Sequence, residues 1–358
     1  MHAPPDASLQ HDLLRLLRGQ APAGVAPEAA IDDALRRYEC GGYLHRACSR
    51  DGRTGDLPQV WAAALERTHR KLVIDNLAAL AAFREVGRHL AKEGATFILL
   101  KGAAYLDDLY DDPGARLLTD IDLLLRRGDA GRVARRLRAA GYVGEIGVDY
   151  PEFRRFEMWR PGAGHTRLEF HWWLGLPLRF NISQDALWER STPAALEGIA
   201  CRRLGPEDAL LFHVAHLSDH YFGPSLKWVL DLREMFRGWT LDRETLVARA
   251  TGWRLQVPLY LSLSHMEKLF PGEAPAGLRD RLTPGRPRLA RLRRWMSQDP
   301  LEFLRPVPQG PSRYPLRCLL IDRPVDAALL AGRVLSRPLT RPLAHLLGRA
   351  TPPWEWRI

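Results

Sequence analysis

The stretch LLKGAAYLDDLYDDPGARLLTDIDLLL, residues 99–125, decides the predicted fold of this 358-residue chain. Residues 96–101 form a short apolar run, which is typical of a buried strand. Residues 102–110 then predict a helix, Asp-Asp-Pro-Gly at 111–114 predicts a turn, and residues 119–125 predict a second strand. Strand, helix, turn and strand in so short a segment indicate a small unit of mixed α and β structure.

Acidic side chains follow the alternation of two predicted strands. Residues two apart share one face of a strand, so Asp120 and Asp122 lie together, opposite the apolar side chains of 119–125. In the later run 166–174, Glu169 and His171 share a face in the same way. If these strands are neighbours, three carboxylates meet. An isolated pair of aspartates is more often a solvated strand face.

Such a cluster of carboxylates requires a counter-charge. Two like charges about 4 Å apart repel by about 4 kcal/mol at an effective dielectric constant of 20. Oxygen ligands with open positions suit Mg²⁺ or Mn²⁺, and paired ions of this kind stabilise in-line phosphoryl transfer. If the three carboxylates converge, Asp120, Asp122 and Glu169 are the candidate metal ligands and catalytic residues.

A phosphate-binding turn is predicted upstream of the aspartates. Lys101 and Gly102 stand where a strand meets a helix, and free backbone N–H groups and the helix dipole favour an anion there. Gly102 lets a phosphate approach the backbone, and Lys101 adds a positive charge. Arg116, four residues before Asp120, could reach the same polyphosphate. These three residues are the predicted nucleotide-binding set; the alternatives are a solvated strand end and a surface ion pair.

The rest of the chain predicts helices around this core. An apolar stripe from Trp61 to Leu90 indicates one long helix, with Gly94 as its C-terminal cap. Runs at 153–160 and 166–174 flank Pro-Gly-Ala-Gly and predict a hairpin. Helical patterns follow at 209–220, 227–236 and 244–270. We therefore expect an α+β protein divided into an N-terminal helical region (1–93), an α/β core (94–204), a helical domain (205–277) and a basic tail (278–358).

The charge of the chain is concentrated in that tail. The formal net charge is +10, and residues 278–358 hold sixteen arginines, no lysine and six acids, so the body is balanced. A processive polymerase is unexpected, because the body offers no basic track for a nucleic-acid backbone. Contact of the tail with anionic lipid, for example through residues 325–335, is an open alternative to a Pro-broken solvated extension. Scattered cysteines and the absence of a signal-like start predict a cytoplasmic protein.

The motifs at 99–125 resemble the signature of an uncharacterised nucleotidyltransferase family within the DNA polymerase beta-type superfamily. The similarity lies in the Lys-Gly turn, the turn at 110–113, Arg116 and the Asp-Ile-Asp strand. LEFHWWL (168–174) resembles the later acidic strand of that family, and residues 204–232 resemble its helical C-terminal part. The resemblance covers roughly residues 70–270 and implies a minimal nucleotidyltransferase fold with a mixed sheet.

The resemblance also implies an activity. A nucleoside monophosphate would pass from an NTP to an acceptor hydroxyl, with release of pyrophosphate. Asp120 and Asp122 would be metal ligands, Glu169 the third carboxylate, and Lys101 and Gly102 phosphate contacts. The acceptor remains open among a peptide, a protein side chain, a sugar and another small molecule. Because the turn is Gly102-Ala103, without a hydroxyl, a catalytically inactive nucleotide- or partner-binding module is the alternative hypothesis.

Three helical features have competing interpretations. His213, His216 and His220 share one helical face and could bind zinc, but hydrogen-bonded or cleft-lining histidines are favoured. Lys227 and Asp231, one turn apart, predict a structural ion pair. The tryptophans at 172, 173, 228 and 253 could stack on a base, but core packing is favoured.

Overall fold

The computed structural model describes residues 7–24, 26–144, 155–162, 166–175, 179–223, 225–295 and 314–332. The strands are β1 (Phe97–Leu100), β2 (Asp120–Leu125), β3 (Arg155–Met158), β4 (Arg167–His171), β5 (Thr192–Leu196) and β6 (Ile199–Arg203). The helices that surround the sheet are α1 (Ala7–Leu17), α2 (Glu28–Tyr38), α3 (Gly41–Arg50), α4 (Gln59–Lys92), α5 (Lys101–Tyr105), α6 (Arg127–Ala139) and α7 (Gln184–Arg190). The later helices are α8 (Pro206–Asp219), α9 (Lys227–Gly238), α10 (Arg243–Trp253), α11 (Gln256–Leu269), α12 (Leu278–Arg281), α13 (Arg286–Trp295) and α14 (Tyr314–Leu319).

One mixed sheet of six strands forms the centre, in the order β3-β4-β2-β1-β6-β5. β2 pairs antiparallel with β1 and parallel with β4, while β3 and β4 form the predicted antiparallel hairpin. β5 and β6 add a second antiparallel pair, which joins β1 through the parallel partner β6. The α+β prediction and the strands at 97–100, 120–125 and 167–171 are thus confirmed.

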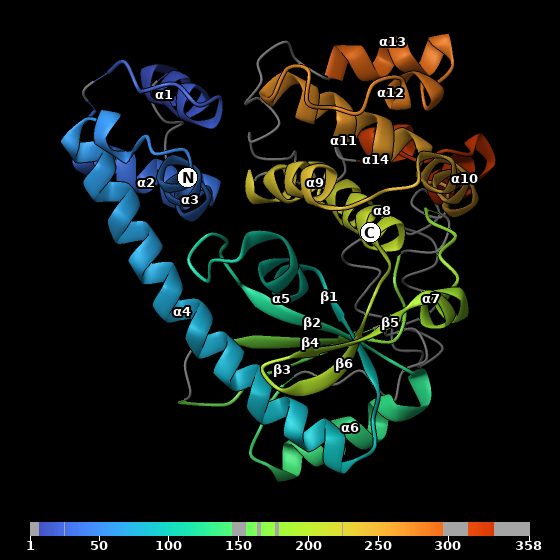
Figure 1. The fold of residues 1–358 in the computed structure, drawn as a ribbon. Coiled ribbons are helices and arrows are strands. Elements are labelled where there is room, and N and C mark those ends of the chain that lie inside the picture. Colours follow the sequence, from blue (N-terminus) through green and yellow to red (C-terminus); the bar gives the residue numbers. More distant parts are fainter. Residues whose placement is uncertain are drawn as a thin grey trace, which may run out of the picture.

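Helices cover both faces of the sheet (Figure 1). α4 and α6 lie below it in that view, and α5, α8 and α9 lie above it. The apolar residues of β1 and β2 are buried. The acidic side chains of β2, which begin at Asp120, lie on the other face of that strand. One contiguous apolar core runs from Leu9 in α1 to Leu282 after α12, so the predicted regions share buried contacts.

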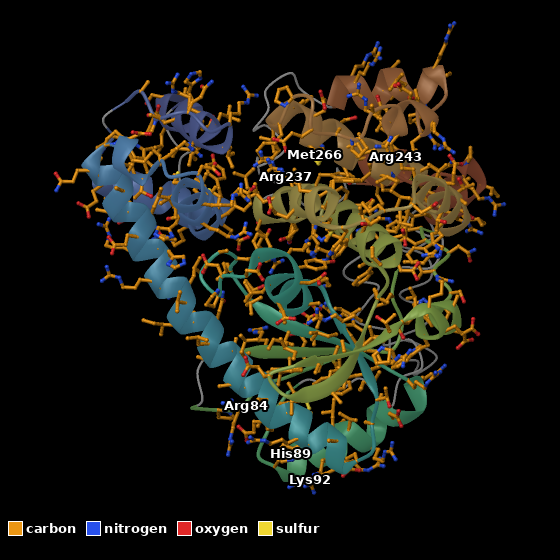
Figure 2. All side chains as sticks on the ribbon, viewed as in Figure 1. Arg84, His89, Lys92, Arg237, Arg243 and Met266 are labelled. Carbon is orange, nitrogen blue, oxygen red and sulfur yellow. The ribbon has the colours of Figure 1, made fainter. Side chains whose placement is uncertain are left out.

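The long helix α4 connects the N-terminal helices to the far side of the sheet. Trp61 and Leu65, at its start, and Phe83 and Leu90, near its end, are buried, as the predicted stripe requires. Gly94 follows the helix with φ +62°, the left-handed conformation of a C-terminal cap. The C-terminal half of α4, where Arg84, His89 and Lys92 are labelled in Figure 2, passes beside α6.

The turn that precedes β2 is fixed from α4. The amide of Asn76 donates to the carbonyl oxygens of Pro113 and Arg116, both at 2.6 Å, and its Oδ1 accepts from the N–H of Leu118 at 3.1 Å. Gly42 of α3 lies against the same turn, since a Cβ there would stand 2.0 Å from the carbonyl oxygen of Gly114. The segment leading into the acidic strand is therefore held by two N-terminal helices.

Several sequence predictions were incomplete or wrong. α2, α3, β5 and β6 were not predicted. The helical pattern at 244–270 is two helices, because Arg254 adopts φ +62° between α10 and α11. The helix predicted at 102–110 begins at Lys101 and continues as a π-helix, η2 (Leu106–Tyr110).

The described part of the basic tail is helical and packs against the body. Leu292 of α13 and Leu320, just after α14, are buried in a small cluster with Leu217 and Leu261. Among the described residues, no helix is both long and apolar enough to cross a bilayer. Of the predicted lipid-contact segment 325–335, residues 333–335 lie outside the described part of the chain.

Candidate active site

Two parallel strands bring the predicted carboxylates together. β2 and β4 are paired so that Asp122 stands beside Glu169 in register. Asp122, Glu169 and His171 each offer a ligand atom, and these atoms lie within 4.8 Å of one another. All three residues are buried. Glu169 was expected to lie close to Asp120 and Asp122. The structure shows this convergence for Asp122 and Glu169.

Three basic side chains surround these carboxylates. Oδ1 of Asp122 accepts from Nζ of Lys101 and lies 2.9 Å from Nε2 of His171, with the Lys101 contact also at 2.9 Å. The same His171 nitrogen is 3.4 Å from Oε2 of Glu169, which accepts from Arg155 Nη1 at 2.8 Å. The protein thus supplies positive charge to the carboxylates from three different elements.

The pKa values follow this arrangement. Burial alone would raise the pKa of Asp122, but Lys101 and His171 hold it well below its ordinary value. Burial likewise opposes ionisation of Glu169, yet its contact with His171 lowers the pKa of that carboxyl. The pKa of His171 is raised despite burial, because both carboxylates accept from it. Asp122 and Glu169 are therefore ionised at neutral pH.

Asp120 is in a different state from Asp122. Burial, and then the negative charge of Asp122, raise the pKa of Asp120 above its ordinary value. Its Oδ1 accepts from the hydroxyl of Thr119 at 3.0 Å, and within the described segments we find no ion pair to it. Asp120 is thus the carboxylate whose charge is least compensated by the protein.

Lys101 has a strained backbone at the junction of β1 and α5. Its φ is +44°, in the left-handed region that residues other than glycine seldom occupy. Its ammonium group lies 5.7 Å from the ring centre of Phe212 in α8 and bonds to Asp122. Burial alone would lower the pKa of Lys101, but Asp122, Asp120 and Glu169 raise it. The strain therefore accompanies a half-buried, charged lysine directed at the carboxylates.

Arg116 is buried against Gly102 and does not face solvent. Its Nε and Nη2 each donate to a carboxylate oxygen of Asp231 in α9 at 2.8 Å, and Nη1 donates to the carbonyl of Leu117. A Cβ on Gly102 would stand 2.8 Å from Arg116 Nη1, so the missing side chain of Gly102 is what admits this guanidinium. The predicted contact of Arg116 with phosphate would require a buried ion pair to open.

The donor set fits a divalent ion. Two ionised carboxylates and an imidazole, close together and buried, are ligands that Mn²⁺ accepts, and Asp120 adds a further carboxylate from the same face of β2. His171 was not predicted as a site residue, although its position on the face of Glu169 was the available signal. Among the described residues this is the one group of this kind.

The helical features turn out differently from one another. Nε2 of His213 lies 2.7 Å from the carbonyl oxygen of Trp228, and His213, His216 and the C-cap residue His220 are not among the described residues that form a metal-ligand group. The predicted ion pair between Lys227 and Asp231 is wrong. Lys227 binds Glu39 at 3.2 Å and Asp231 binds Arg116, because these side chains point away from each other into different neighbours.

The sequence matches one family model over most of its length. The match is to the family described as "Uncharacterised nucleotidyltransferase" and spans residues 29–271. The chain belongs to this nucleotidyltransferase family. The matched region contains every candidate site residue and begins earlier than the resemblance at 70–270 implied, so α2 and α3 lie within the family region.

Solved structures give partial similarities. The solution structure of the antibiotic-resistance factor ANT(2'')-Ia has 14% identity and a TM-score of 0.36, covering 53% of this chain and 97% of that one. The lincosamide antibiotic adenylyltransferase LnuA, bound to lincomycin, has 16% identity and a TM-score of 0.29, with 41% and 89% covered. A nucleotidyltransferase-like protein from Paracoccidioides brasiliensis has 16% identity and a TM-score of 0.37, with 58% and 93% covered.

No curated protein matches the chain. The assignment to the nucleotidyltransferase family therefore stands on the family model.

Proposed function

We propose that this nucleotidyltransferase-family protein transfers a nucleoside monophosphate from an NTP to an acceptor hydroxyl, with release of pyrophosphate, in a reaction that depends on Mg²⁺ or Mn²⁺. The observation that carries the proposal is the register of β2 and β4, which places Asp122 beside Glu169 at the end of the sheet where Lys101 begins α5. A buried cluster of ionised carboxylates beside a lysine suits a metal-bound polyphosphate.

Each site residue has a role in this proposal. Asp120, Asp122 and Glu169 hold the divalent cation, and His171 adds a nitrogen ligand or fixes the two carboxylates that it contacts. The ion, when bound, lowers the pKa of the acceptor hydroxyl and neutralises charge on the triphosphate. Glu169 accepts the proton of the hydroxyl or orients it.

The turn at Lys101 and Gly102 contacts the phosphates in this proposal. The ammonium group of Lys101 already lies at the carboxylates, so it would pair with the oxygens of a phosphate bound beside Asp122. Arg116 acts as a positioning residue, because its pair with Asp231 sets the floor under Gly102.

Transfer of label from nucleotides tests the activity. The protein is incubated with labelled ATP, CTP, GTP or UTP, with Mg²⁺ or Mn²⁺, in a host lysate, and transferred label and pyrophosphate are measured. We expect transfer from at least one NTP and a loss of more than about 100-fold in Asp122→Asn, since removing a ligand that stabilises the transition state has effects of this order.

A matched carboxylate serves as the control. Asp75 lies on the exposed side of α4, where it pairs with Lys71, so Asp75→Asn removes the same charge from the surface and not from the carboxylate cluster. Full activity in Asp75→Asn together with loss in Asp122→Asn supports the proposal. Equal transfer by wild-type protein and Asp122→Asn would contradict it.

A non-catalytic nucleotide-binding module is the second candidate. The observation in its favour is that Lys101, His171 and Arg155 already compensate the carboxylates without an ion. Calorimetric titration with NTP distinguishes the two functions. Binding that needs Mg²⁺ and is accompanied by pyrophosphate release supports the enzyme, and binding of equal strength in EDTA without release supports the module.

A further inference from the structure

Three aromatic side chains meet where α8 and α9 face each other. The ring centres of His216 and Trp228 are 5.0 Å apart, those of His220 and Trp228 are 4.9 Å apart, and those of the two histidines are 4.5 Å apart. We call this set the α8–α9 aromatic cluster. The last turn of α8, its C-cap residue and the first turn of α9 thus contribute to a single cluster.

The α8–α9 aromatic cluster is partly open to solvent, as is Trp173, which is 47% exposed. His220 is exposed, and His216 and Trp228 are half-buried. In contrast, His213 is only 1% exposed, and Trp172 and Trp253 are core residues at 7% and 6%. The bond between His213 and the carbonyl of Trp228 ties the backbone of Trp228 to α8. The rings are therefore anchored but reachable.

The cluster lies beside the candidate active site. Phe212 contacts the ammonium group of Lys101, and His216 and His220 follow Phe212 by four and eight residues along α8. At a rise of 1.5 Å per residue, these positions are about 6 and about 12 Å further along the helix. The charges of Lys101, Arg155 and Glu169 act on His220, and that of Lys101 acts on His216.

The charge state of the two histidine rings suits a planar, uncharged part of a ligand. Burial, and then the positive charge of Lys101, lower the pKa of His216 well below its ordinary value, and the pKa of His220 is also lowered. Both rings are neutral at pH 7, so they do not attract phosphate. Neutral aromatic rings stack on planar heterocycles of different kinds, because every base has a π-face.

We propose that the α8–α9 aromatic cluster binds the base of the nucleoside triphosphate whose phosphates lie at Lys101 and the carboxylates. This inference rests on the proposed function, and it assigns Trp228, His216 and His220 as the base-binding residues. A nucleoside attached to phosphates at Lys101 spans the separation to the cluster along α8. Trp228 packs against the small apolar cluster that includes Leu217 and Leu261, as predicted, and in this proposal its half-buried ring also contacts the base.

Paired ligands with and without a base test this assignment. Binding of α,β-methylene NTP analogues and of inorganic tripolyphosphate is measured by calorimetry in Mg²⁺ for the full chain. The variants are Trp228→Leu, Trp228→Phe and His220→Ala, with His11→Ala, at an exposed position of α1, as the control. Circular dichroism and the unfolding midpoint verify that each variant is folded.

We expect Trp228→Leu to weaken binding of the preferred analogue by about tenfold to 100-fold, as loss of a base-stacking ring does. Tripolyphosphate should bind within twofold of wild type, Trp228→Phe should restore most of the affinity, and His220→Ala should weaken the analogue more than His11→Ala does. Unchanged binding of the analogue to Trp228→Leu, or equal weakening of both ligands, would overturn the base-binding role. Wild-type protein that binds neither ligand would instead overturn the proposed function, and the inference with it.

Discussion

Asp120 and Asp122 are two residues apart on the same face of β2, yet their carboxyl groups have opposite pKa shifts. The ammonium group of Lys101 and the imidazole of His171 are both directed at Asp122, whereas Asp120 is half-buried beside a negative neighbour. A cation that approaches from solvent would therefore stabilise Asp120 more than Asp122. An added positive charge should therefore change the pKa of Asp120 more than that of Asp122.

The left-handed backbone of Lys101 predicts an unusual ranking of variants. Lys101→Gly and Lys101→Ala both remove the ammonium group, but only alanine keeps the side-chain penalty at φ +44°. We expect Lys101→Gly to be more stable than Lys101→Ala by about 1 kcal/mol in urea unfolding. Alanine at least as stable as glycine would show that the backbone at this position is not strained.

The site residues divide into those that local pattern reveals and those that it does not. Alternation alone places Asp122 and Glu169 on one face each, and the structure brings the two faces together. The pair of Arg116 with Asp231 joins residues 115 positions apart, so no local spacing indicates it. His171 shares a strand face with Glu169 in the sequence pattern, but it was not predicted as a ligand.

At the scale of elements, the turn before β2 depends on one residue of α4. Asn76 is fully buried and makes three hydrogen bonds to this turn, so Asn76→Ala leaves buried backbone groups without their partners. We expect a loss of about 3 kcal/mol in the free energy of unfolding, measured in urea. The neighbouring exposed variant Asp75→Ala should change it by less than about 0.5 kcal/mol, and equal effects of the two variants would refute the role of Asn76.

α11 carries a histidine that makes the helix sensitive to acid. Burial lowers the pKa of His265 from 6.5 to about 3. The unfolded chain therefore binds more protons than the folded one between these values, and stability falls as the pH drops from 6.5 towards 3. At pH 4.5 this residue should account for a loss of about 2–3 kcal/mol relative to pH 7.

Comparison with His265→Leu isolates that contribution. Urea unfolding at pH 7 and pH 4.5 should show a smaller acid-induced loss in the variant than in wild type, by roughly the same 2–3 kcal/mol. Identical losses in the two proteins would mean that His265 does not titrate on unfolding.

Secondary structure was predictable where an element has a long or regular pattern. The stripe of α4 and the apolar run of β1 are examples. β5 and β6 were missed because Pro193, Arg202 and Arg203 interrupt the apolar alternation of a short edge pair. The break between α10 and α11 was missed because Arg254 has no sequence preference for the left-handed conformation that it adopts.

At the scale of the whole molecule, α9 links the segment before β2 to the N-terminal helical region. Asp231 holds the turn before β2 through Arg116 and accepts from Tyr110, Glu234 accepts from Tyr43 of α3, and Lys227 binds Glu39. In Figure 1 this helix lies between the N-terminal helices and the C-terminal ones, above the sheet. α9 therefore connects the turn that leads into the candidate site with the N-terminal helices.

The buried pair of Arg116 and Asp231 predicts strong coupling between these parts. Removing one partner leaves a charge uncompensated, so Arg116→Met and Asp231→Leu should each lower the free energy of unfolding by about 3–5 kcal/mol. The double variant should be more stable than the sum of the single losses predicts, by at least about 2 kcal/mol. Strict additivity in urea unfolding would show that the pair is not coupled.

The 34-residue helix α4 bears on any attempt to isolate the sheet as an independent catalytic fragment. Its first turns present Trp61 and Leu65 to α2 and α3, while its last turns present Phe83 and Leu90 to the sheet. A fragment trimmed to the α/β core would have to cut this helix, which is about 51 Å long. Otherwise the apolar side chains at the start of the helix would be exposed to water. Such a fragment should self-associate, so the leading sixty residues are as necessary to a usable preparation as the strands that bear the acids.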